Sequence, residues 1–140
     1  MVEQTTRYGI SITVELDVAQ AIARTKEELA REGFGVLSEI DIAATLKKKL
    51  DVEFRPYVIL GACNPPLAHQ ALMAERDIGL LLPCNVIVYA ADAPGRSVVA
   101  AMDPVEALAL TGNEKIRPIA EDVKLRLTRV LEGVARGSSR

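Results

Sequence analysis

The spacing of apolar residues predicts a chain in which strands and helices alternate. Apolar and polar positions alternate from Tyr8 to Leu16, which is the period of a strand with one buried face. Asp17 is a typical helix N-cap, and apolar residues then recur every three to four positions until Gly33 ends the helix. The same patterns, bounded by caps and turn residues, predict strands over about 35–42, 56–63, 84–91 and 97–102 and helices over about 43–50, 65–76, 103–112 and 116–134.

The order of these elements favours an α+β fold. The order is β-α-β-α-β-α-β-β-α-α, and a turn at 92–96 joins the last two strands into an antiparallel hairpin. We therefore predict a sheet with helices packed on one face. At 140 residues the chain has the length of one domain, for which we expect a core over 5–135 and a flexible tail over 136–140.

Two of the predicted strands are apolar on both faces and so need cover on both sides. In the strand at 56–63, Tyr57 and Ile59 point one way and Val58 and Leu60 the other, and the strand at 84–91 has the same character. Helices on one face cover only that face, so the second face must meet another helix, a ligand or another subunit. A symmetric homodimer is the simplest of these arrangements, and we expect a homo-oligomer.

Composition excludes several classes of protein. Hydrophobic residues make up 49% of the chain, which rules out intrinsic disorder. The formal net charge is -2 and aromatic residues make up 4%, so we predict no nucleic-acid partner. No apolar run reaches the roughly 20 residues of a membrane helix, and the first residues do not form a signal peptide. Since two cysteines make no disulfide framework, we expect a cytoplasmic protein that does not bind membranes.

The two cysteines are the clearest candidates for chemistry. Cys63 ends one buried strand and Cys84 begins the next, and each is followed by an asparagine, Asn64 and Asn85. Cys63 also precedes a predicted helix N-terminus, where the helix dipole lowers a thiol pKa. The functional interpretations are a reactive thiol, a dithiol switch or two ligands for a soft metal ion. The alternative is that both are small apolar core residues, since free cysteine is among the most buried residue types.

Three further side chains are candidates for a ligand site, and two of them also have a structural interpretation. His69, the only histidine, lies on the predicted helix that follows Cys63. It is either a general base or third metal ligand beside Cys63, or a residue on an exposed helix face. Asn64 binds a substrate carbonyl or simply caps the helix. Asn85 has no comparable structural role at a strand start, so it stays among the ligand-binding candidates. We predict no catalytic residues, because no phosphate-binding glycine loop, nucleophile elbow or zinc-protease motif occurs.

The segments around the cysteines resemble the domain-of-unknown-function family 302. The resemblance rests on YVILGACNP at 57–65 and GLLLPCNVIVY at 79–89, and it extends from the first strand to the last helix. It implies a fold similar to the TATA-box-binding-protein-like class, a curved, mainly antiparallel sheet with helices on one side, and it suggests a dimer. It supplies no reaction, and fold analogy alone does not make a DNA-binding protein. Many relatives carry an acid where this chain has Ala90, so any ligand role of that acid is lost here.

These observations support three hypotheses about function. The first is a dimeric module that binds a small molecule or a soft metal ion at Cys63, Asn64, Cys84 and Asn85, with His69 as an outer candidate. The second is a structural or protein-interaction module whose cysteines belong to the core. The third is a weak cysteine-dependent enzyme that uses Cys63 with His69. No cofactor is identified, and the candidate metal ligands are the two cysteines.

Overall fold

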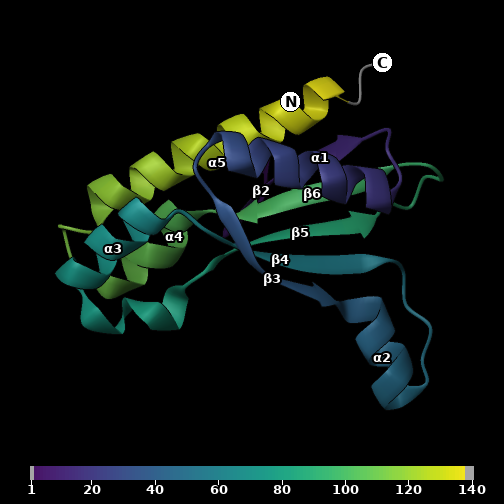
Figure 1. Cartoon of the computed structure of the whole chain (residues 1–140), viewed down its shortest axis with the longest axis horizontal. Helices are drawn as coiled ribbons and strands as arrows, with labels where there is room; N and C mark the ends of the chain where they lie inside the picture. The colour runs from purple at the N-terminus through teal and green to yellow at the C-terminus, as the bar shows by residue number, and fades with distance from the viewer. Residues whose placement is uncertain (1, 138–140) are drawn as a thin grey trace.

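Six antiparallel strands form one open sheet in the computed structural model, which describes residues 2–137 (Figure 1). Their order across the sheet is β1-β2-β6-β5-β4-β3, which confirms the predicted α+β class and the β5–β6 hairpin. The strands are β1 Glu3–Thr6, β2 Gly9–Val14, β3 Gly35–Asp41, β4 Tyr57–Cys63, β5 Cys84–Ala90 and β6 Ser97–Met102. The helices are α1 Val18–Arg31, α2 Ile42–Leu50, α3 Pro65–Ala74, α4 Pro104–Leu108 and α5 Arg117–Gly137, with 3-10 helices η1 Arg76–Leu81 and η2 Ala109–Thr111.

Capping residues in the sequence set the boundaries of the helices. The Asp17 carboxylate accepts a hydrogen bond from the Gln20 backbone N–H at 2.8 Å, and the Gln20 side chain accepts one from the Asp17 backbone N–H. Gly33 follows α1 with a φ of 84°, a left-handed conformation that glycine adopts without steric cost. Pro118 lies in the first turn of α5, where its missing N–H costs no hydrogen bond.

The first strand differs from its prediction, because an additional strand precedes it. Alternation predicted one strand from Tyr8 to Leu16, whereas β2 covers only Gly9–Val14 and pairs with β1 at the sheet edge. All four residues of β1 are exposed, so no apolar alternation marks them. The pairing rests on backbone hydrogen bonds, which a search for hydrophobic periodicity does not detect.

The sheet has one face covered by helices and one open face. α1 and α5 lie on the same side of the sheet (Figure 1), and α1 packs closely on α5. The inward residues of the four central strands are buried beneath them: Ile10, Ile12, Val14, Val58, Leu60, Ala62, Cys84, Val86, Val88, Val99 and Ala101. The alternate residues of β4 and β5 are also mostly apolar but are at most half-buried apart from Gly61. Both faces of these two strands are thus mostly apolar, as predicted, and one of the two faces forms the uncovered side of the sheet.

The C-terminal helix α5 supplies much of the core. Its buried residues recur at helical spacing, and five of them pack on the sheet and on α1: Val123, Leu127, Val130, Leu131 and Val134. Ala120 belongs instead to a second buried cluster with Ala71, Ile78, Leu108 and Ile116. Arg136 and Gly137, predicted as part of the tail, complete α5, while 138–140 lie outside the described residues. Within residues 2–137 no helix is both long and apolar enough to cross a membrane.

Candidate ligand-binding site

An apolar cavity of about 300 Å³ lies where β4 ends and β5 begins. Residues of α3, of α5 and of the segment around the cis Leu82–Pro83 bond line it together with the two strand ends. None of the lining residues is charged, and Asn64 is the only one with an amide side chain. Leu37 and Leu72 line the cavity and are 68% and 42% exposed, so the cavity opens to solvent.

Asn64 is a structural cap at the edge of this cavity. Its side-chain oxygen accepts a hydrogen bond from the Leu67 backbone N–H at 3.3 Å, which caps α3. Its side-chain nitrogen donates to the Glu32 carbonyl oxygen at 3.2 Å, at the end of α1. The amide therefore joins the start of α3 to the end of α1, and both of its ends are already hydrogen-bonded.

Both cysteines line the cavity as free thiols. Ala62 pairs with Cys84 across β4 and β5, so Cys63, at the end of β4, directly follows the residue that pairs with Cys84. Cys84 is buried, and this desolvation, with a smaller contribution from Cys63, raises the pKa of its thiol to about 11. Cys84 is consequently protonated at neutral pH and a weak nucleophile. Cys63 is half-buried and is the more accessible of the two.

The structure does not bring His69 to the thiols. His69 lies on α3, faces solvent and is absent from the cavity lining. In the part of the chain that the structure describes, no three His, Cys, Asp or Glu side chains gather closely enough to hold a metal ion. A metal ion at the cysteines would thus have two protein ligands, fewer than the four of a structural zinc site.

Asn85 lies on the opposite face of the sheet from Cys84. Strand side chains alternate, so the residue after Cys84 points to the open face, where Asn85 is exposed. It borders a second, larger hollow of about 750 Å³, which is lined mainly by the open face, Tyr57 and Tyr89 included, and reaches Ala135 on α5. The predicted residues therefore divide into two groups, since only Cys63, Asn64 and Cys84 reach the apolar cavity.

Most of the cavity wall comes from residues that the sequence does not mark as functional. Leu67, Ala68 and Leu72 on α3 and Ile119 and Val123 on α5 all line it. In the sequence they are apolar positions on helices, a pattern that predicts core packing. Their role depends on how α3, α5 and the strand ends come together, and no local pattern encodes that arrangement.

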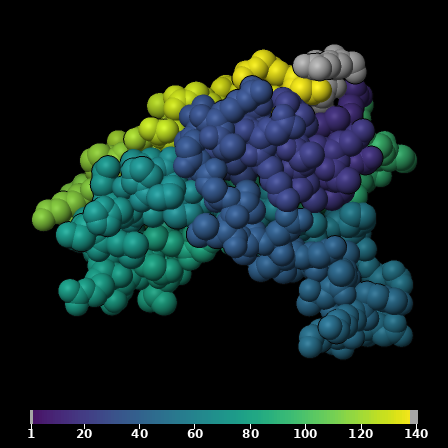
Figure 2. Space-filling view, in the orientation of Figure 1, coloured from purple at the N-terminus to yellow at the C-terminus, as the bar shows by residue number. Residues whose placement is uncertain are grey.

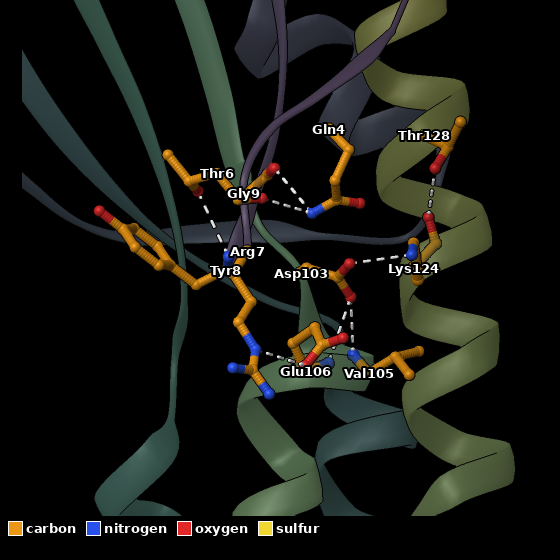
Figure 3. A network of polar contacts seen from close by, with 10 residues as sticks. All are labelled: Gln4, Thr6, Arg7, Tyr8, Gly9, Asp103, Val105, Glu106, Lys124 and Thr128. Atoms are coloured by element: carbon orange, nitrogen blue, oxygen red, sulfur yellow. Dashed lines mark hydrogen bonds and ion pairs between the residues drawn. The ribbon is translucent and has the colours of Figure 1, made fainter.

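A separate polar cluster stabilises the junction between β6 and α4 (Figure 3). The Asp103 carboxylate is 1% exposed, accepts a hydrogen bond from the Val105 N–H at 3.0 Å and lies 2.8 Å from the Lys124 Nζ. The Asp103 backbone N–H donates to the Tyr8 carbonyl oxygen at 2.8 Å. These contacts join α4, α5 and the β1–β2 turn. Because Asp103 lines neither hollow, we interpret the cluster as structural.

Comparison with known proteins identifies the family but no activity. A crystal structure of an uncharacterised conserved DUF302 protein from Bacillus stearothermophilus is similar, with a TM-score of 0.85 and 28% sequence identity. The match covers 92% of this chain and 99% of that chain. The comparison with curated proteins finds no match. The family model described as "Domain of unknown function DUF302" matches residues 10–134, nearly the whole folded chain, and the protein therefore belongs to the DUF302 family.

Proposed function

We propose that the protein binds a small apolar molecule in the cavity bordered by Cys63 and Cys84. The observation that carries the proposal is the cavity lining, which has no charged side chain and an asparagine whose two ends are already hydrogen-bonded. Binding of an apolar ligand to such a cavity is favourable, because the ligand replaces water or empty space next to apolar surface. Recognition then depends on shape and apolar contact rather than on charge.

The size of the cavity limits the class of ligand. An apolar cavity of about 150 Å³ stays dry and binds benzene. The cavity here is about 300 Å³, near the lower limit for small-molecule sites. Two fused rings, or a branched aliphatic group of similar volume, would fill it.

The state of the cysteines favours an apolar ligand over a soft metal ion. A thiol must lose its proton to bind a metal, and the raised pKa of Cys84 adds to the cost of that step. A protonated thiol behaves instead as a small, polarisable apolar group that packs well against an aromatic ring. The raised pKa of Cys84 also argues against this residue as a nucleophile.

Indole is a suitable probe, because it has two fused rings. We expect calorimetric titration at pH 7 to give one bound indole per chain. Ala68→Leu fills the cavity from α3 and should weaken binding at least tenfold. His69→Leu is the matched control, because it changes the next residue on the same helix, which is exposed and outside the cavity. It should bind indole as the wild type does.

Two outcomes would contradict this proposal. One is equal affinity of the wild type and Ala68→Leu for indole, with circular dichroism confirming that the variant folds. The other is stoichiometric binding of Cd²⁺ that Cys63→Ala abolishes and Ala68→Leu leaves intact, without any binding of indole. The second result would favour a soft-metal site at the two cysteines.

A further inference from the structure

A guanidinium group lies beside the polar edge of the apolar cavity. Asn64 is the only lining residue with an amide side chain, and its nitrogen donates to the Glu32 carbonyl oxygen at 3.2 Å. The Nη1 of Arg126 donates to the same oxygen at 3.1 Å. Two donors that share one acceptor atom are close neighbours, so the guanidinium of Arg126 lies next to the amide of Asn64. The cavity therefore has an uncharged wall and a positive charge just beyond one edge.

The spacing of residues along α5 brings Arg126 to this edge. Ile119 and Val123 line the cavity, and Arg126 follows Val123 by three residues, so it lies one turn further along the same side of the helix. The surroundings of Gly33 show the same proximity. A Cβ at Gly33 would lie 3.1 Å from Nδ2 of Asn64 and 4.0 Å from Nη1 of Arg126. Both side chains thus approach the same point of the backbone.

The guanidinium of Arg126 is held in place but has hydrogen-bonding capacity left over. Its Nε donates to the Asp122 carboxylate at 2.9 Å, and its Nη1 donates to the Glu32 carbonyl oxygen. Its Nη2 has no partner among residues 2–137. The side chain is 33% exposed, so a ligand can reach it. A guanidinium has five N–H donors, and those that remain free match the geometry of a carboxylate.

The charges around Arg126 favour a ligand with a single negative charge. Asp122 is paired with Arg126, and the Glu32 carboxylate is paired with Arg129 at 2.8 Å. These two cations and two anions balance, so a ligand anion shares Arg126 with Asp122 instead of meeting an unpaired charge. A doubly charged phosphate would experience more repulsion from the two acidic side chains than a carboxylate does.

We propose that the ligand of the cavity is an apolar carboxylic acid whose carboxylate pairs with Arg126. This inference rests on the proposed function and adds an orientation to it. The uncharged wall selects the apolar group by size and shape, whereas the guanidinium outside the wall determines which end of the ligand points outward. A short alkyl linker suffices between the two groups, because Arg126 is adjacent to a residue of the wall.

Calorimetric titration at pH 7 with two matched indoles tests this proposal. Indole-3-propionate should bind the wild type about fivefold more tightly than indole-3-propionamide, which has a similar shape without the charge. Arg126→Met should bind the two compounds equally, with circular dichroism confirming that the variant folds. Asp122→Asn provides a second test that retains Arg126. It removes the competing carboxylate and should increase the preference for the propionate.

Arg117→Met is the matched control for Arg126→Met. Arg117 also lies on α5 and pairs through its Nε with an acid one turn away, Glu121, as Arg126 does with Asp122. It does not line the cavity and does not contact Glu32. This variant should retain the wild-type preference for the propionate. An equal loss of preference in Arg117→Met and Arg126→Met would overturn the proposal, because it would show a general effect of charge.

The outcomes separate this proposal from the proposed function. Wild type that binds indole but shows equal affinity for the propionate and the propionamide overturns the carboxylic acid and leaves the apolar cavity as a binding site. A preference for the propionate that decreases in Asp122→Asn also overturns it. Absence of binding of indole and of both derivatives by the wild type overturns the cavity proposal as well.

Discussion

At the scale of single residues, Cys84 combines the two roles that the sequence leaves open. It belongs to the buried core cluster of the covered face, and it also lines the apolar cavity. Burial keeps its thiol protonated, so the side chain contributes apolar contact rather than charge. A cysteine can thus be a core residue and part of a binding site when the site is itself apolar.

The raised pKa of Cys84 makes stability depend on pH in the alkaline range. Folding raises the pKa from 9.0 to about 11, so the stabilisation is fully present below pH 9 and is lost as pH rises toward 11. Chemical denaturation with a reductant present should show a loss of roughly 2 kcal/mol between pH 8 and pH 10.5 in the wild type relative to Cys84→Ala. Cys63→Ala is the control and should retain most of the wild-type pH dependence, because Cys63 makes only the smaller contribution to the raised pKa of Cys84. Identical pH dependence in the wild type and Cys84→Ala would mean that the thiol is not buried as described.

The sequence places both cysteines at strand ends but does not establish that they are close. Their proximity follows from the antiparallel pairing of β4 with β5. Gly61 lies within the strand predicted over 56–63, but the sequence does not show why this position is a glycine. A Cβ there would collide with the side chain of Ser38 and press on Pro83, which only the folded arrangement reveals.

At the scale of elements, short helices depend on side chains that tie them to their neighbours. α4 has five residues, too few to be stable in isolation. Asp103 both caps α4 and pairs with Lys124 on α5 (Figure 3). The cap lies next to the helix in sequence, but the partner on α5 is distant in sequence and carries no local signal.

Replacing Asp103 should therefore destabilise the protein more than replacing an ordinary cap. Asp103→Ala removes a cap and leaves Lys124 without its partner, which should cost about 2 kcal/mol in free energy of unfolding. Asp17→Ala is the matched control, since Asp17 caps α1 at an exposed position, and it should cost about 1 kcal/mol. Urea denaturation measures both. An equal cost for the two variants would show that the ion pair with Lys124 adds no stability.

Elements with a buried stripe could be predicted, and elements without one could not. Strands β4 to β6 and helices α1 and α5 carry periodic apolar residues because they pack on the core. β1 is fully exposed and escaped prediction, since its pairing uses backbone atoms. The helix α2 was predicted, but its projection from the body (Figures 1 and 2) was not, because that depends on the absence of packing around it.

At the scale of the whole molecule, the sheet separates two surfaces of different character. The covered face ends in the apolar cavity, and the open face lines most of the larger hollow. The sequence predicts strands that are apolar on both sides, but it assigns the four candidate residues to one site. Alternation along β5 separates Asn85 from Cys84, because Asn85 follows Cys84 directly and so points the other way.

Methyl NMR spectroscopy at saturating indole tests the binding proposal most directly, because it locates the ligand. We predict that the largest chemical-shift changes fall on Leu67, Ile119 and Val123, which line the cavity. The methyl groups of Ile87 and Val98 on the open face should change little. Shifts confined to Ile87 and Val98, with Leu67, Ile119 and Val123 unperturbed, would contradict the assignment of the cavity as the ligand site.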